Sequence, residues 1–137
     1  NLVSRVAGLC KNEIPKANQV LPVYSSIDQV MAQRDKLTIK GNYSLAVFTN
    51  TNSMFPVLDE GTIGIEISIT NYSQIQIGTI ASYDPIGENY TIIHRVIDIQ
   101  EDSNGTYYIF KGDNNPVNDP YKVRPGQLRR ILVGLMW

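Results

Sequence analysis

The sequence predicts a mainly β protein, and three features of the chain lead to this expectation. Short runs rich in β-branched and aromatic residues recur along the chain, and clusters of Gly, Pro, Asn and Asp separate them. One run, residues 62–69, alternates isoleucine with smaller or polar residues, which is typical of a half-buried strand. Apolar residues at helical spacing occur only near the N-terminus. We therefore expect a mainly β fold with one or two short N-terminal helices.

The length and composition exclude several classes of protein. A chain of 137 residues, of which 42% are hydrophobic, is long enough for one domain with a packed core and a short appendage. It has 12 basic and 13 acidic residues, and this balance gives no basic footprint for nucleic acid. The single cysteine, Cys10, predicts neither a disulfide framework nor a thiolate metal site.

The sequence contains no run of 18 apolar residues, so we expect no membrane-spanning helix within it. No signal-peptide pattern occurs at the N-terminus, and a chain that starts at Asn1 is interpreted as a piece of a longer protein. Four N-x-S/T sequons occur, more than chance predicts, at Asn42, Asn71, Asn89 and Asn104. They favour an extracytoplasmic location, although a chain that is simply rich in Asn, Ser and Thr would contain them too.

Residues 1–40 form an N-terminal appendage in this interpretation, and residues 41–137 form a β domain. Helical spacing of apolar residues predicts one helix over 1–12 and a second over 26–36. A hairpin turn over 102–105 is followed, after one more strand, by an irregular loop over 112–121. Strands are expected at 37–40, 43–48, 62–69, 79–83, 90–100, 106–111 and 128–137.

Residues 51–61 lie between two predicted strands and place Ser53 on a turn. Pro56 has no backbone N–H, so a regular strand ladder cannot continue through this stretch. A serine on such a turn can point its hydroxyl into a cleft while nearby backbone amides stay free. Alone, the pattern is typical of a polar loop residue, and a functional interpretation needs support from other parts of the chain.

Two later stretches give that support. Residues 92–96 contain His-Arg-Val with the only histidine, His94, and residues 111–119 begin with Lys-Gly-Asp-Asn. Together with the Ser-Met-x-Pro of residues 53–56, they resemble a type I signal peptidase of the branch found in archaea, the endoplasmic reticulum and some Gram-positive bacteria. The resemblance covers residues 43–134 and implies a coiled, partly open antiparallel β fold of the signal-peptidase type.

The chemistry of these residues favours nucleophilic catalysis. A serine hydroxyl attacks a carbonyl efficiently only when a base takes its proton, and histidine, here His94, suits that task near neutral pH. A carboxylate on the far ring nitrogen would fix the tautomer. Counted back from the hairpin turn, residues 113–115 lie opposite His94, which favours Asp113. The resemblance implies Asp119 instead, and we expect Asp119 to orient the histidine and Asp113 to shape the loop.

An acyl-transfer site also needs donors for the oxyanion, and the backbone N–H of Ser53 is one candidate. The resemblance implies the hydroxyl of Thr51 as a second. Asn52 stands where the family usually has glycine, and asparagine tolerates the left-handed backbone conformation better than most residues. Arg95 faces away from His94 and is expected in a structural ion pair.

The resemblance implies a serine endopeptidase that cleaves signal peptides from exported preproteins after small residues, without a metal or cofactor. Its catalytic domain would lie at the cell surface or in the endoplasmic-reticulum lumen, anchored by a transmembrane segment outside these residues, and nucleic acid is not an expected partner. One alternative is a related peptidase with a narrow client, such as a pilin or biofilm precursor. Others are a self-cleaving regulator in which Lys111 is the base, and a non-catalytic binding module on the same fold.

Overall fold

The computed structural model describes residues 29–33 and 36–136, and the chain divides into two compact units, Asn1–Asn42 and Tyr43–Trp137. In the first unit, strands β1 (Gln29–Gln33) and β2 (Lys36–Lys40) pair antiparallel.

The helix predicted over 26–36 is wrong for residues 29–33, which form a strand. An isolated helix of about ten residues is marginal in water, and helix propensity is readily overridden by a neighbouring segment that supplies a hydrogen-bonded ladder. The strand expected at 37–40 is that neighbour here. The helix predicted over 1–12 lies outside the described residues.

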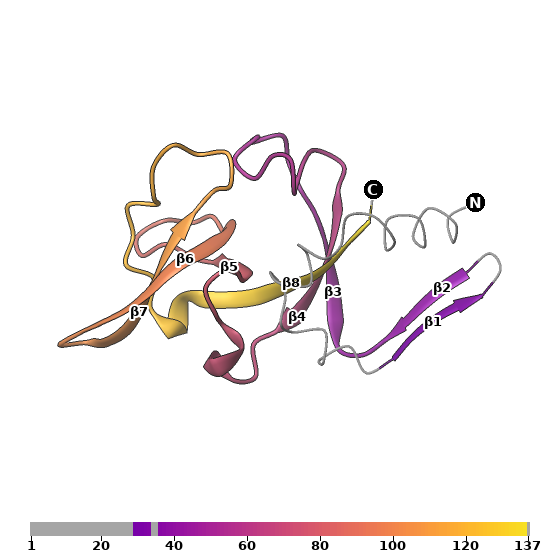
Figure 1. The fold of residues 1–137 in the computed structure, drawn as a ribbon, viewed down its shortest axis with the longest axis horizontal. Coiled ribbons are helices and arrows are strands. Elements are labelled where there is room, and N and C mark those ends of the chain that lie inside the picture. The colour runs from indigo at the N-terminus through magenta and orange to yellow at the C-terminus, as the bar shows by residue number, and fades with distance from the viewer. Residues whose placement is uncertain (1–28, 34–35, 137) are drawn as a thin grey trace. The chain divides into compact units, whose positions relative to one another are not determined.

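The described part of the second unit contains one open antiparallel sheet of six strands, and this confirms the predicted mainly β fold (Figure 1). The strand order is β3-β4-β8-β5-β6-β7, so β8, drawn in yellow, lies between β4 and β5 and joins the two halves of the sheet. The bounds are Tyr43–Val47 for β3, Ile63–Ser68 for β4, Ile80–Tyr83 for β5, Ile92–Asp102 for β6, Gly105–Lys111 for β7 and Leu128–Met136 for β8.

Two short 3-10 helices, η2 (Tyr72–Gln74) and η3 (Pro125–Gln127), lie in the connections. The side chain of Asn71 begins η2 by accepting a hydrogen bond from the Ser73 N–H at 2.9 Å. None of the helices among the described residues is long and apolar enough to cross a membrane.

The hairpin of β6 and β7 turns at residues 103–104, inside the turn that the sequence predicts. A β-bulge halfway along β6 shifts the pairing by one residue, and Arg95 consequently pairs with Lys111. Continued by one residue, this register places Gly112 opposite His94. The expectation that residues 113–115 lie opposite the histidine is therefore wrong, because counting from the turn does not detect the bulge.

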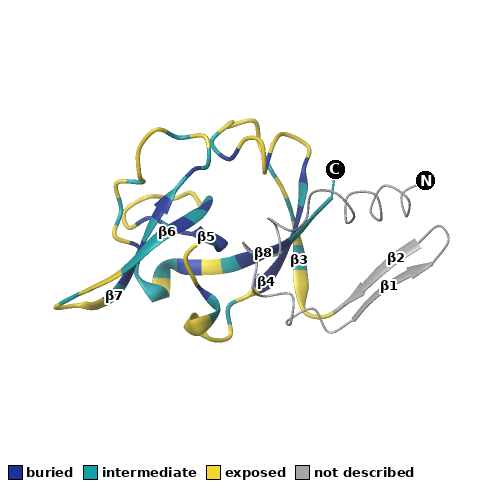
Figure 2. Cartoon of the chain, viewed as in Figure 1, coloured by how far each residue is buried: buried dark blue, intermediate teal, exposed yellow. Residues whose placement is uncertain are grey.

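Strand β4 is buried on both faces rather than on one (Figure 2). Ile65 and Ile67 on one face are 5% and 6% exposed, but Glu66 on the other face is also only 6% exposed. The expectation of a half-buried strand is wrong here, because four consecutive residues, 64–67, are buried and the Phe48 ring packs against the second face at Gly64. A Cβ added at Gly64 on that face would lie 2.7 Å from the ring of Phe48.

The segment that carries the predicted serine is anchored by the hydrophobic core. Met54 and Leu58 are each 3% exposed and form a buried cluster with Ile80 of β5 and Leu132 of β8. Full burial of an apolar side chain of this size contributes about 1.5–3 kcal/mol. The neighbouring Ser53 is therefore held in a fixed position relative to these two strands.

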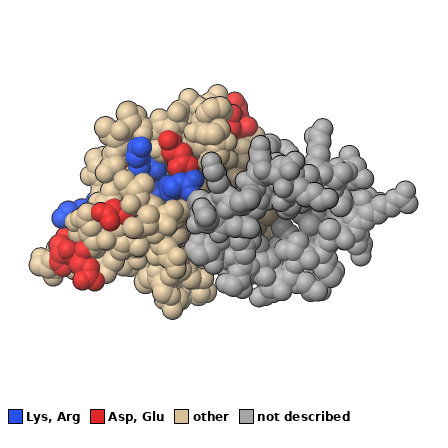
Figure 3. Space-filling model, in the orientation of Figure 1, with Lys and Arg blue, Asp and Glu red and all other residues tan. Residues whose placement is uncertain are grey.

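Basic and acidic side chains lie beside one another on the face drawn in Figure 3. Several of the described basic and acidic side chains form ion pairs, and one pair, Arg124 with Asp102, braces the β6–β7 hairpin. The Arg124 guanidinium lies 2.8 Å from both carboxylate oxygens of Asp102 and holds the pKa of that carboxyl below its usual range.

Candidate active site

The turn that carries Ser53 depends on one left-handed residue. Asn52 has a φ of 58°, a conformation that asparagine adopts more readily than most residues with a side chain. Asparagine therefore fits where the resembled family usually has glycine. After the serine, the Leu58 N–H donates to the Met54 carbonyl at 3.0 Å and closes the next turn. Ser53 remains partly exposed beside the buried Met54.

The loop that follows β7 is docked on this turn through hydrogen bonds to two of its carbonyl oxygens. The Asn114 N–H donates to the Ser53 carbonyl at 2.9 Å, and Asn114 Nδ2 donates to the Asn52 carbonyl at 3.0 Å. A Cβ added at Gly112 would lie 2.6 Å from the Ser53 carbonyl oxygen, so only glycine permits this approach. The Gly-Asp-Asn segment thus fixes the serine turn against β7.

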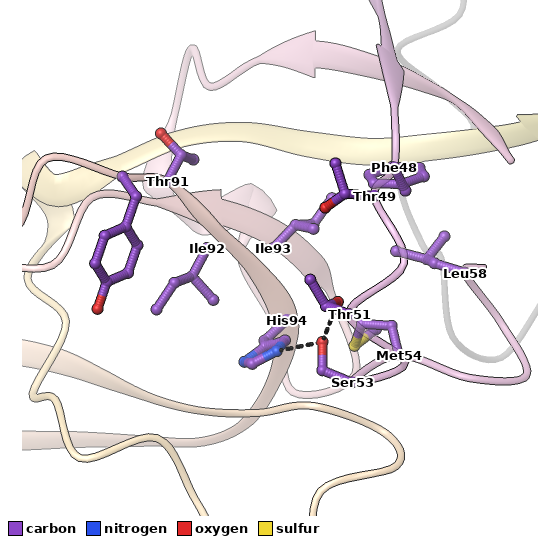
Figure 4. Close-up of a pocket in the computed structure, with 11 residues that line it drawn as sticks. Phe48, Thr49, Thr51, Ser53, Met54, Leu58, Thr91, Ile92, Ile93 and His94 are labelled. Carbon is purple, nitrogen blue, oxygen red and sulfur yellow. Dashed lines mark hydrogen bonds between the residues drawn. The ribbon is translucent and has the colours of Figure 1, made fainter. Parts of the chain in front are cut away.

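His94 of β6 joins Ser53 to Asp119, and Figure 4 shows its ring turned toward the serine. Ser53 Oγ lies 3.0 Å from His94 Nε2, and Asp119 Oδ2 lies 2.7 Å from His94 Nδ1. The side chains of His94 and Asp119 are only 10% and 7% exposed. With its proton on Nδ1, the imidazole donates to Asp119 and leaves Nε2 free to accept the serine proton.

Asp119 has a second side-chain partner, which the sequence does not reveal. The Tyr83 hydroxyl donates to the same Oδ2 at 2.7 Å, and the Asp119 N–H donates to the Phe110 carbonyl at 2.8 Å. Tyr83 is fully buried, and its ring lies 4.6 Å from that of Phe110. Burial and the adjacent carboxylate strongly raise the pKa of Tyr83, so its hydroxyl remains a neutral donor.

Asp113, the other candidate carboxylate, is held away from the histidine. Arg95 Nε donates to Asp113 Oδ1 at 2.7 Å and Arg95 Nη2 to Oδ2 at 2.6 Å, a bidentate pair in which both side chains are 19% exposed. Arg95 Nη1 also donates to the Gly78 carbonyl at 2.9 Å. The structural ion pair expected for Arg95 is confirmed, and Asp113 braces the loop.

Thr51 lies on the nucleophile side of the site, with its Oγ1 3.2 Å from Ser53 Oγ. Within the described residues, the side chains that hydrogen bond Ser53 Oγ are Thr51 and His94, and Lys111 bonds neither Ser53 nor His94. The arrangement therefore matches the histidine alternative more closely than the lysine alternative.

A pocket of about 330 Å³ adjoins Ser53, and its walls are largely apolar (Figure 4). Phe48 and Leu58 line it beside the serine turn, and Ile92 and Ile93 line it from β6. The described residues contain no group of His, Cys, Asp and Glu side chains that could hold a metal ion. The site as described places a hydroxyl, an imidazole and a carboxylate in contact beside a largely apolar recess.

Several known proteins are similar to this chain. The human signal peptidase complex catalytic subunit SEC11C is 31% identical over 101 residues, which cover 72% of this chain and 51% of the relative. The chain is related to signal peptidase catalytic subunits. This confirms the predicted resemblance to the endoplasmic-reticulum-type signal peptidases. In the same family, the signal peptidase complex catalytic subunit sec11 of Dictyostelium discoideum is 29% identical over 99 residues, 72% of this chain and 54% of the relative.

The chain spans about half the length of these signal peptidase relatives. A shorter match, 50% identical over 42 residues, covers 31% of this chain and 21% of the uncharacterized protein MJ0260 of Methanocaldococcus jannaschii. No family model matches the chain.

Proposed function

We propose that residues 41–137 are the catalytic domain of a serine endopeptidase that removes signal peptides from exported preproteins after small residues. The observation that carries this proposal is the continuous contact from Ser53 Oγ through both ring nitrogens of His94 to Asp119. The names of the relatives, which are catalytic subunits of signal peptidase complexes, support the same reaction.

In the proposed mechanism, Ser53 Oγ attacks the scissile carbonyl carbon while its proton passes to Nε2 of His94, 3.0 Å away. Asp119 keeps the ring in the required tautomer and stabilises the imidazolium. The tetrahedral intermediate then collapses, and the imidazolium gives its proton to the leaving amine of the mature protein. A water molecule, deprotonated by His94, hydrolyses the acyl-enzyme, releases the signal peptide and restores Ser53.

Two groups are proposed to hold the oxyanion. The Ser53 N–H donates no hydrogen bond to any other described residue, so it can bind the developing charge. The Thr51 hydroxyl, 3.2 Å from Ser53 Oγ, supplies the second donor. Removal of one such donor typically lowers kcat by about 10²–10³.

The apolar pocket beside Ser53 is the proposed site for the residue that precedes the cleaved bond. Its largely apolar walls favour an uncharged side chain, and the preference for a small residue rests on the resemblance to the signal peptidases. We further infer a membrane anchor outside these residues and a location at the cell surface or in the endoplasmic-reticulum lumen. The excess of N-x-S/T sequons supports the extracytoplasmic location, and the anchor rests on the resemblance to the signal peptidases.

Cleavage of a preprotein by the purified chain tests the function. Ser53→Ala should lower kcat/KM by at least about 10³, because the nucleophile is lost while the oxyanion donors remain. The matched control is Ser103→Ala, which removes the same hydroxyl from an exposed serine of the hairpin turn and should retain parental activity. Activity of the Ser53→Ala variant within tenfold of the parent would sink the assignment.

The base is tested with a second pair of variants. His94→Ala should lose nearly all activity, whereas Lys111→Met should retain most of it, because Lys111 makes no hydrogen bond to Ser53 within the described residues. If the lysine variant is folded and inactive while the histidine variant cleaves, the chain uses a Ser-Lys mechanism.

A further inference from the structure

Met54, the residue after Ser53, belongs both to the hydrophobic core and to the apolar pocket. Its side chain packs with Leu58, Ile80 and Leu132, and Met54 also lines the pocket together with Ser53 (Figure 4). The residue is only 3% exposed in total. A small reagent therefore approaches the Met54 side chain through the apolar pocket, because core residues cover the rest of it.

The sulfur atom of Met54 joins the serine turn to the loop that follows β7. The Asp113 N–H donates to Met54 Sδ at 3.4 Å, and this N–H donates to no other acceptor within the described residues. Leucine would fill nearly the same volume, but it has no acceptor for this N–H. One lone pair of the sulfur is used in this contact, which leaves the other lone pair for reaction.

We propose that the Met54 thioether is an oxidation site in the wall of the apolar pocket, where hydrogen peroxide converts it to a sulfoxide. Hydrogen peroxide is uncharged and hardly larger than water, so it fits a pocket of about 330 Å³. The sulfur lone pair attacks one peroxide oxygen, and the O–O bond breaks. The sulfur loses two electrons, and the attacked oxygen passes its proton to the departing hydroxide, which leaves as water.

A sulfoxide at Met54 disables the neighbouring Ser53, because it makes an apolar side chain polar. The contact with the Asp113 N–H leaves no space for an oxygen atom between the sulfur and the nitrogen, so an oxygen on that side pushes the loop off the serine turn. An oxygen on the pocket side occupies the recess for the substrate, and the core side offers it no donor. This effect on activity rests on the proposed endopeptidase function, whereas the oxidation itself does not.

Mass spectrometry of the native chain after treatment with hydrogen peroxide tests the site. The methionines Met31, Met54 and Met136 fall on three different tryptic peptides, because lysine or arginine separates them in the sequence. Met136, which is partly exposed, is the internal reference. We expect Met54 to gain one oxygen atom at a rate within about tenfold of that at Met136. A native chain in which Met136 is fully oxidised and Met54 remains a thioether would overturn the proposal.

Cleavage of a preprotein peptide tests the effect on activity, and each variant is compared with its own untreated sample. Peroxide should lower kcat/KM of the parent at least about tenfold, in step with the fraction of Met54 sulfoxide. Met54→Leu should keep its kcat/KM after the same treatment, because leucine carries no sulfur. The matched control, Met136→Leu, makes the same replacement at a methionine that does not line the pocket, and it should lose activity as the parent does.

A second variant imitates the sulfoxide without any oxidant. Glutamine has the same side-chain length as methionine and carries an oxygen on its δ atom, as the sulfoxide does. Met54→Gln should therefore have a kcat/KM about tenfold below that of Met54→Leu in untreated samples. Equal kcat/KM values for these two variants would contradict the proposed effect of an oxygen atom at this position.

The two measurements separate this proposal from the proposed function. If the untreated parent cleaves no peptide, the proposed function fails, and the mass of the tryptic peptides still decides whether Met54 is an oxidation site. If the parent cleaves and its fully oxidised Met54 form has an unchanged kcat/KM, the oxidation has no effect on Ser53. Inactivation by peroxide that persists in Met54→Leu would likewise overturn the proposal, because the sensitive group would then be another residue.

Discussion

The hydrogen bond from Tyr83 to Asp119 gives the sharpest test of how the site is held together. Tyr83→Phe removes one hydroxyl and keeps the ring that packs 4.6 Å from Phe110. The change therefore reports on the contact with Asp119 Oδ2 and leaves the packing intact. After the substitution, His94 is the remaining side chain that bonds this carboxylate among the described residues.

The structure sets the size of the expected effect. The Tyr83 hydroxyl is 2.7 Å from a carboxylate that is only 7% exposed, and hydrogen bonds to charged groups contribute about 1.5–3 kcal/mol. We expect the free energy of unfolding to fall by about 2 kcal/mol. A less constrained Asp119 orients His94 less well in the transition state, so we expect kcat to fall about tenfold with little change in KM.

The assay combines calorimetric unfolding with steady-state cleavage of a preprotein peptide. Tyr121→Phe is the matched control, because it removes a hydroxyl whose hydrogen-bond partner is the exposed Tyr90, at 3.3 Å. That control should change the unfolding free energy by less than about 0.5 kcal/mol and leave kcat unchanged. Parental kcat and parental stability in Tyr83→Phe would refute the reasoning.

Two further predictions concern the carboxylates. Asp119→Asn should lower kcat by about 10³–10⁴, because the imidazole loses its orienting carboxylate. Asp113→Asn should mainly lower stability, because Arg95 loses its carboxylate partner. If Asp113→Asn instead shows the larger loss of kcat and Asp119→Asn the larger loss of Tm, the orienting role belongs to Asp113. Burial raises the pKa of the Glu66 carboxyl above its ordinary value of 4.5. A carboxyl whose pKa is higher in the folded than in the unfolded state lowers the stability of the fold as the pH rises through the folded-state pKa. Glu66→Gln should therefore raise the Tm relative to the parent at pH 7 but not at pH 4, and a lower Tm at pH 7 would contradict this.

Much of the site follows from local features of the sequence. Pro56 and the runs on either side of it predict the turn that carries Ser53, and that turn is present. The hairpin turn over 102–105 predicts that the loop after β7 returns near His94, and Asn114 does contact the serine turn. Side-chain alternation also places Arg95 on the face opposite His94, where it meets Asp113.

The remaining features depend on contacts between distant segments. Tyr83 reaches Asp119 only because β5 pairs with β6 in one register, and no local pattern marks this tyrosine. Glu66 is buried on the same face of β4 as Gly64, which Phe48 contacts, although strand alternation predicts an exposed side chain there. The strand at residues 29–33 forms because a partner follows it at once, which a helical spacing of apolar residues does not indicate.

The central position of β8 determines when Ser53 and His94 can meet during synthesis. Ser53 follows β3 and His94 lies on β6, but β4 and β5 share no partner strand until Leu128–Met136 has been made. A nascent chain therefore carries both groups before the sheet can align them. A ribosome-stalled chain that ends before residue 128 should not react with a serine-directed phosphonate, whereas a chain that displays residue 136 should; labelling of the shorter chain would show that the site assembles without β8.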